Sequence, residues 1–125
     1  MPQITQMGRV MVPVRDQDAA IAFYTEKLGF ALVADVPFGG TERWVEVAPS
    51  GGGAAIALVP PRGDYQTGRM TGIALESRDP RADHDELKAQ GVDVDKELMG
   101  GDGTVPLLFF FRDGDGNQLM IVQGQ

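Results

Sequence analysis

The sequence predicts an α+β fold made of two tandem modules, each with the order strand, helix and three strands. The same succession of strand-like and helix-like patterns occurs in both halves of the 125-residue chain. Asp16 and Asp79 each precede a helical pattern, and they lie 63 residues apart. The glycines that end the two helical patterns, Gly29 and Gly91, lie 62 residues apart. An internal duplication of half the chain explains both offsets.

The first module, residues 1–61, begins with a strand at 8–14, where valines alternate with other residues. Asp16 then stands where a helix N-cap belongs, and apolar residues recur at helical spacing until Gly29. This pattern predicts an amphipathic helix of about 12 residues. Three strands bounded by Pro and Gly turns are expected at 30–36, 43–47 and 54–59.

The second module, residues 69–125, follows a Pro- and Gly-rich linker at 62–68 and repeats this order. Ile73 and Leu75 alternate with other residues on an expected strand, and Asp79 caps the helix that follows. We expect the two modules to form one domain over the whole chain. The last three strands are expected at 92–98, 107–111 and 118–122.

Composition and charge exclude several classes of function. The chain has no Cys, which removes disulfides, thiolate metal sites and Cys nucleophiles. A net charge of -7 and the lack of a Lys/Arg-rich run argue against nucleic acid as a partner. No apolar stretch is long enough to span a membrane, and the N-terminus lacks the apolar segment of a signal peptide. We therefore expect a cytoplasmic protein with no membrane partner.

Two stretches of the chain carry a family resemblance. Residues 14–24 read VRDQDAAIAFY, with LGF at 28–30, and residues 111–117 read FRDGDGN. Together with the duplicated element order, they resemble the vicinal oxygen chelate superfamily, which includes glyoxalase I, bleomycin- and fosfomycin-resistance proteins and extradiol dioxygenases. The resemblance implies strands that curve into a half-barrel around a pocket, with the helices outside. It also implies a homodimer in which one module from each chain lines each pocket.

In metal-dependent members of the family, divalent-metal ligands come from the first and last strands of each module. The resemblance places these positions at Arg9, Ala57, Gly72 and Met120. None of the four offers an imidazole or a carboxylate, and a guanidinium brings positive charge where the cation would sit. We therefore expect no metal and no cofactor. The single histidine, His84, is expected to be a partly exposed residue of the second helix rather than a catalytic one.

Strand alternation and the resemblance together predict a pocket wall that is mostly apolar. Phe110 and Leu108 are expected to point inward, while Phe109 and Phe111 pack under the helix. Trp44 is expected either to stack on a flat ligand or to cover a dimer seam, and the loop at 38–40 to gate the pocket or form a plain hairpin turn. The expected ligand-binding residues are Arg9, Met11, Trp44, Ala57, Gly72, Glu76, Leu108, Phe110, Gln118 and Met120.

Two hypotheses of function follow. The first is a metal-free protein that sequesters a small hydrophobic or aromatic molecule, like the bleomycin-resistance branch. The second is an enzyme of the same superfamily, a glyoxalase or other lyase, a dioxygenase or a thiol transferase. Such an enzyme would be metal-dependent through ligands placed elsewhere, or metal-independent with Glu76 or Glu46 as base and Arg9 as oxyanion partner. Binding is preferred because the expected wall has few titratable groups; a subunit whose half-barrel is filled by its own side chains is a third alternative.

Overall fold

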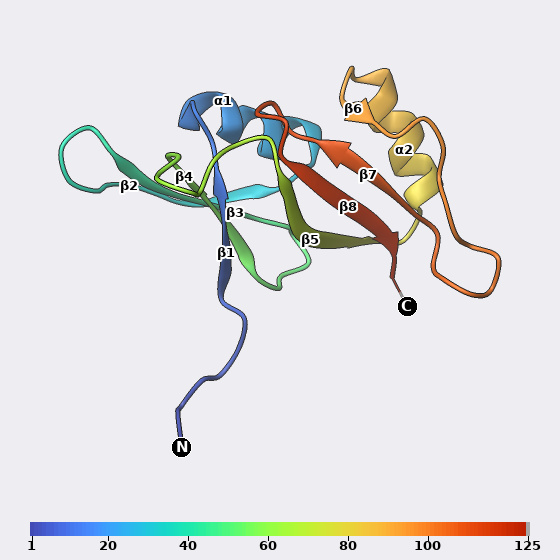
Figure 1. Cartoon of the computed structure of the whole chain (residues 1–125), viewed down its shortest axis with the longest axis horizontal. Helices are drawn as coiled ribbons and strands as arrows, with labels where there is room; N and C mark the ends of the chain where they lie inside the picture. Colours follow the sequence, from blue (N-terminus) through green and yellow to red (C-terminus); the bar gives the residue numbers. More distant parts are fainter. Residues whose placement is uncertain (125) are drawn as a thin grey trace. The chain divides into compact units, whose positions relative to one another are not determined.

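The computed structural model describes residues 1–124, which divide into two compact units, 1–67 and 68–124. Each unit contains one four-stranded sheet with both parallel and antiparallel neighbours (Figure 1). The predicted α+β fold with two modules of the same element order is confirmed. No helix in the described residues is long and apolar enough to cross a membrane.

The first unit has the strand order β1-β4-β3-β2, with β1 parallel to β4 and the other pairs antiparallel. Asp16 caps the helix as expected, because its carboxylate accepts a hydrogen bond from the Ala19 N–H at 3.1 Å. Gly29, with a φ of 74°, follows the helical stretch. The elements are β1 (Arg9–Pro13), α1 (Gln17–Ala22), the π-helical η1 (Phe23–Lys27), β2 (Ala31–Pro37), β3 (Arg43–Ala48) and β4 (Ala55–Val59).

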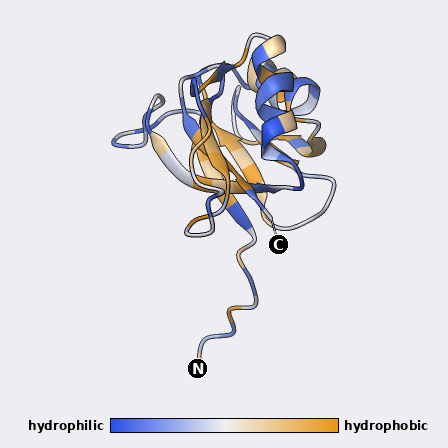
Figure 2. Ribbon diagram, turned by 90° about the vertical axis from the view of Figure 1, so that its right-hand side faces the viewer, coloured by the Kyte–Doolittle hydropathy of each residue, from blue (hydrophilic) through white to orange (hydrophobic). Residues whose placement is uncertain are grey.

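The helical segment of the first unit packs on one face of its sheet. Tyr24 is fully buried, as are Val45 and Leu58 on the strands. The Gln17 side-chain amide donates to the carbonyl oxygens of Arg43, at 2.8 Å, and Leu58, at 2.9 Å, which ties the start of α1 to β3 and β4. In Figure 2 the strands are largely coloured as hydrophobic, whereas the helices present more hydrophilic residues. Apolar burial between helix and sheet therefore accounts for the core of this unit.

The second unit repeats this topology with the order β5-β8-β7-β6. Its helix begins with Asp79 as N-cap, whose carboxylate accepts from the Ala82 N–H at 3.1 Å, and with Pro80 in the first turn. Phe109 and Phe111 are fully buried, whereas Leu108 is only half-buried, as the predicted alternation requires. The elements are β5 (Met70–Ser77), α2 (Pro80–Ala89), β6 (Asp93–Val94), β7 (Leu108–Arg112) and β8 (Gln118–Gln123).

The strand predicted at 92–98 is wrong in length, because β6 has only two residues. The strand ends at Val94: the Asp95 N–H still donates to the Phe110 carbonyl at 2.9 Å, but the Phe110 N–H donates to the Asp95 carboxylate, at 3.2 Å, rather than to a backbone carbonyl. The Asp95 carbonyl oxygen is in turn hydrogen-bonded to Nε2 of His84 at 2.6 Å. Side-chain hydrogen bonds thus replace part of the β-ladder at this edge.

The expectation that His84 is partly exposed is also wrong, since only 5% of the residue is accessible. Pro80, His84 and Leu87 recur at helical spacing and are the buried residues of α2. The imidazole packs edge-to-face against the ring of Phe109, with centroids 5.0 Å apart. His84 is therefore a core residue whose polar atom is satisfied by the Asp95 carbonyl.

Candidate functional site

Each sheet packs one face against the helix of its own unit, and its other face carries no helix of that unit in the described residues. We call the helix-free face of the first sheet the first face and that of the second sheet the second face. Strand register assigns their residues, because paired residues in neighbouring strands point to the same side. The first face carries Arg9, Met11, Ala34, Val36, Trp44, Glu46, Ala55 and Ala57. The second face carries Ala74, Glu76, Leu108, Phe110, Arg112, Gln118, Met120 and Val122.

A single row of four residues crosses the first face. Met11, Ala57, Glu46 and Ala34 are successive partners in β1, β4, β3 and β2. Ala57 has no accessible surface, so it forms the floor between the larger side chains of this row. The two alanines leave the Glu46 carboxylate as the only titratable group of the row.

Glu46 connects two other residues of the first face. Its Oε2 atom accepts a hydrogen bond from Nε of Arg9 at 3.0 Å and another from Nε1 of Trp44 at 2.6 Å. The Glu46 side chain is 11% exposed, whereas that of Arg9 is 55% exposed. The two donors compensate the partly buried charge, and the charge-assisted contact with Arg9 fixes both side chains in one arrangement.

Aromatic and aliphatic side chains lie beside this polar group. The rings of Phe38 and Trp44 are 6.2 Å apart and tilted by 52°. Phe38, Val36 and Met11 each leave half or more of their surface exposed. The loop at 38–40 is a hairpin turn between β2 and β3, closed by the Phe38 N–H donating to the Glu42 carbonyl at 2.8 Å. The first face therefore combines a nearly buried carboxylate with exposed apolar side chains at Met11 and Val36, and Phe38 lies beside it.

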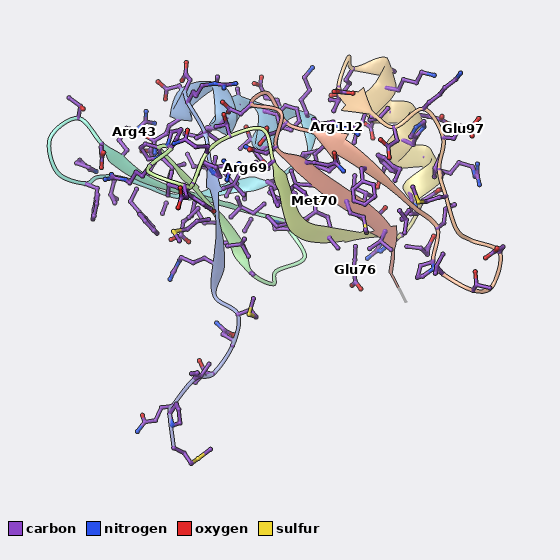
Figure 3. The ribbon with its side chains drawn as sticks, in the orientation of Figure 1. Arg43, Arg69, Met70, Glu76, Glu97 and Arg112 are labelled. Carbon is purple, nitrogen blue, oxygen red and sulfur yellow. The ribbon has the colours of Figure 1, made fainter. Side chains whose placement is uncertain are left out.

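The second face is apolar along its middle and polar at its ends. Ala74, Met120 and Phe110 form one row across β5, β8 and β7, and Glu76, Val122 and Leu108 form the next. Figure 3 shows Glu76 projecting from the C-terminal part of β5. At the other end, Arg112 is paired with Asp95 at 2.8 Å and with Asp93 at 3.6 Å.

Gly72 lies in an irregular part of β5 and has no side chain to present. The register between β5 and β8 shifts between Met70 and Ala74, and Gly72 has a φ of 78° there. The Thr71 hydroxyl donates to the Gln118 carbonyl at 2.8 Å and accepts from the Ile73 N–H at 3.1 Å. This bulge leaves the backbone, and no functional group, at the position where the family resemblance places a metal ligand.

A second group of charged side chains in the first unit lies away from the first face. Arg43 donates to both carboxylate oxygens of Asp35, at 3.0 and 2.9 Å, and its Nη1 lies 2.9 Å from Asp18 of α1. The hydrogen bonds from Arg43 hold the pKa of Asp35 below its ordinary value of 3.8. Asp35 pairs in register with the buried Val45, so this group belongs to the helix-covered side. It stabilises the unit and does not enter the candidate site.

The ten residues predicted for the site fall into two groups. Four lie on the first face: Arg9, Met11, Trp44 and Ala57. Five lie on the second face, and Gly72 lies in the β5 bulge beside it: Glu76, Leu108, Phe110, Gln118 and Met120. Sequence reasoning gave Glu46 only as an alternative base, although its spacing of two residues from Trp44 on one strand already indicated the same face.

The residues present do not fit the divalent metal of the metal-dependent family members. The four inferred positions hold Arg9, Ala57, Gly72 and Met120, which supply no carboxylate or imidazole. Within residues 1–124, no group of three or more His, Asp or Glu side chains is placed to hold a metal ion. On the first face, the one carboxylate already accepts two protein hydrogen bonds.

Comparison with known families identifies the class of protein. Residues 6–121 match the model of the Glyoxalase/Bleomycin resistance protein/Dioxygenase superfamily, and the chain belongs to this superfamily. The resemblance noted in the sequence is thereby confirmed.

Individual relatives are similar to this chain over nearly their whole length. A crystal structure of a superfamily member from Sphaerobacter thermophilus is 31% identical, with a TM-score of 0.89 over 98% of this chain and 100% of that one. TnmS3, described as an antibiotic binding protein from Streptomyces sp. CB03234, is 34% identical, with a TM-score of 0.84 over 100% of both chains. A probable lactoylglutathione lyase of Vibrio parahaemolyticus is 31% identical over 94% of this chain and 92% of its own.

Proposed function

We propose that this protein binds and sequesters a small hydrophobic or aromatic molecule on its helix-free sheet faces, without a metal. The observation that carries the proposal is the first face, where exposed Met11, Val36 and Phe38 lie with Trp44 around one oriented ion pair. Small-molecule sites have this composition, mostly apolar with a few fixed polar groups. Exposed apolar surface of this kind on a soluble domain calls for a partner.

The second face and one relative support the same proposal. Phe110, Met120 and Leu108 give the second face an apolar and polarizable surface. TnmS3, which is 34% identical over the full length of both chains, is described as an antibiotic binding protein. A relative that binds an antibiotic supports a small-molecule ligand for this chain.

The test uses Trp44, the only tryptophan of the chain, as its reporter. A panel of neutral aromatic alcohols, including 2-naphthylmethanol, is added while the indole N–H signal of Trp44 is followed by NMR. We expect a saturable shift at one ligand per site, with the compound recovered unchanged. If no member of the panel shifts the signal, or if the compound is consumed over many turnovers, the proposal is wrong.

A matched pair of variants checks that binding occurs on the first face. Met11 and Met99 are about equally exposed, at 52% and 50%, but only Met11 belongs to the first face. Met11→Asp places a charge on the apolar surface and is expected to weaken binding at least tenfold. Met99→Asp makes the same chemical change in the loop between β6 and β7 and should bind like the parent protein. Equal affinities in the two variants would contradict the assignment.

A second candidate function is catalysis within the same superfamily. It is favoured by the relative described as a probable lactoylglutathione lyase, and by the close pair of Arg9 and Glu46 on an open face. In the metal-independent version, Glu46 or Glu76 acts as base and Arg9 stabilises an oxyanion. Turnover that Arg9→Met abolishes would establish it. For the metal-dependent version, elemental analysis after loading with divalent metal decides, and less than about a tenth of an equivalent would exclude it.

We also propose that the chain forms a homodimer. β2 is an edge strand of its sheet, and Leu32 and Val33 on it are 45% and 55% exposed. Apolar side chains on an unpaired edge favour association with another chain. Sedimentation velocity of the purified protein should give the mass of two chains, and Val33→Lys should shift the species toward one chain. A parent protein that sediments as a single chain at all concentrations would contradict this.

A further inference from the structure

Arg9 has an unusual combination of constraint and exposure. Its Nε–H donates to Glu46, whose side chain is only 11% exposed. The two terminal nitrogens of the guanidinium have no hydrogen-bond partner among the described residues, and more than half of the side chain is accessible. The Arg9 guanidinium is thus held in place through its Nε atom, while its two terminal nitrogens remain available to a ligand. We call these two nitrogens the outer edge of Arg9.

We propose that the outer edge of Arg9 binds a carboxylate, and that the ligand of the first face is an aromatic carboxylate whose ring lies against the apolar residues around Trp44. This inference rests on the proposed binding function and names its ligand class. The planar guanidinium donates two parallel hydrogen bonds to a carboxylate, a geometry that a lysine ammonium cannot offer. Because Glu46 fixes the guanidinium beforehand, little further side-chain entropy is lost on binding.

Glu46 is the positioning residue in this arrangement. Its Oε2 atom receives both the Arg9 Nε–H and the Trp44 indole N–H, so one oxygen sets the orientation of the cation and of the ring together. Since the indole N–H is already engaged, Trp44 offers a ligand its ring rather than a hydrogen bond. The cation and the ring therefore form one recognition unit for an anion attached to an aromatic system.

Other arginines of the first unit are already held in ion pairs, and Arg62 is one of them, bound to Glu42. Apart from Arg9 and Glu46, the side chains of the first face are apolar or aromatic. Arg43 is bound to Asp35 and Asp18 on the helix-covered side. The exposed Arg9 guanidinium would repel a cationic ligand, and the Glu46 carboxylate is already paired with Arg9. The local charge therefore favours an anion, even though the whole chain carries a charge of -7.

The experiment compares three probes with the same ring: 2-naphthoate, 2-naphthylmethanol and 2-naphthylmethylammonium. Affinities come from calorimetry, and the Trp44 indole N–H signal shows that each probe reaches the first face. We expect 2-naphthoate to bind about tenfold more tightly than the alcohol, and the ammonium to bind most weakly. In Arg9→Met the carboxylate should bind no better than the alcohol, while the affinity of the alcohol stays within about twofold. Arg9→Lys keeps the positive charge without the planar guanidinium. Its affinity for 2-naphthoate should lie between those of the parent protein and Arg9→Met.

Arg81→Met is the matched control. Arg81 is an exposed arginine of α2 whose side chain has no partner among residues 1–124, and it lies on neither face. Its replacement should leave the affinities of all three probes unchanged. The indole signal of each variant also reports whether the first unit is folded as in the parent protein.

The possible results separate this inference from the proposed function. If none of the three probes shifts the indole signal, the binding function itself is contradicted. If the probes bind but 2-naphthoate has no advantage over the alcohol, or Arg9→Met weakens both equally, binding stands and the carboxylate site is wrong. If Arg81→Met removes the advantage of 2-naphthoate as Arg9→Met does, the preference is a general charge effect and the site is likewise wrong.

Discussion

The two units share a backbone pattern and differ in the chemistry of their open faces. Met11 pairs with Ala57 across the parallel strands of the first sheet, and Ala74 pairs with Met120 in the second, at the same offset of 63 residues. The next strand brings Glu46 beside Ala57 in one unit and Phe110 beside Met120 in the other. The duplication thus conserves the strand order and, in this row, the strand register, while the same row carries the Glu46 carboxylate in one unit and the Phe110 ring in the other.

This difference shows what the fold requires and what it leaves free. The helix-covered sides of both sheets are filled by buried apolar residues such as Leu58 and Phe109, as packing demands. The helix-free sides have no such requirement, so residues there can differ between the units. Function is therefore expected on the helix-free faces, and substitutions on the two sides of one strand should have different effects.

The largest expected effect tests this contrast within β7. Phe109→Ala removes a ring with no accessible surface that packs on His84, and should lower the free energy of unfolding by about 3–5 kcal/mol. Phe110→Ala, one residue further on, changes the second face, and should cost about 1 kcal/mol or less. Urea titration followed by circular dichroism measures both. Equal losses of stability would show that the two sides of the sheet do not differ as described.

The next effect concerns the polar group of the first face. Glu46→Ala leaves the Arg9 Nε–H and the Trp44 indole N–H without their acceptor, and should lower the free energy of unfolding by about 1–3 kcal/mol. Glu46→Gln retains an acceptor oxygen and should lose less. Urea titration gives the stabilities, and the Trp44 indole N–H signal shows whether its hydrogen bond is kept. A Glu46→Ala variant as stable as the parent, with an unmoved indole signal, would contradict the role of Glu46.

The second unit offers a comparable test at His84. His84→Leu keeps the apolar packing against Phe109 but leaves the Asp95 carbonyl without its imidazole partner. We expect a loss of about 1–2 kcal/mol in the free energy of unfolding, with little change in ligand affinity. Backbone amide exchange in the segment between α2 and β7 should also become faster. If His84→Leu abolished binding while the stability was unchanged, His84 would be functional rather than structural.

Much of the fold could be predicted from the sequence, because its signals are local. Asp16 and Asp79 are N-caps in the structure as well, since a cap depends only on a side chain and the backbone three residues on. The alternation that buries Phe109 and Phe111 follows from the period of a strand. The burial of His84 and the early end of β6 were missed, because both depend on Asp95, whose side chain and carbonyl bind residues far along the chain.

The candidate site was predictable residue by residue but not as an arrangement. The family resemblance placed Arg9 on the expected wall and strand alternation added Met11, whereas Trp44 was expected either to stack on a ligand or to cover a dimer seam. The structure assigns all three to one sheet face. Sequence periodicity does not predict how β1 and β3 are aligned against β4. This register brings Arg9 close to Glu46. The central role of Glu46 is therefore a result of tertiary pairing, for which the spacing to Trp44 gave only a partial signal.

The smallest expected effect concerns the ion pair between Asp35 and Arg43, which has a counterpart in the second unit. Asp35 binds Arg43 in the first unit, and Asp95 binds Arg112 in the second. Hydrogen bonds from Arg43 lower the pKa of Asp35, so its contribution to stability is fully present above its ordinary pKa of 3.8 and is lost as the pH falls through the lower folded value. The stability advantage of the parent protein over Asp35→Asn, measured by urea titration, should be constant from about pH 7 to pH 5 and shrink below about pH 4. If the stability difference between the parent protein and Asp35→Asn grew as the pH fell, the Asp35–Arg43 contact would not favour the ionised carboxylate.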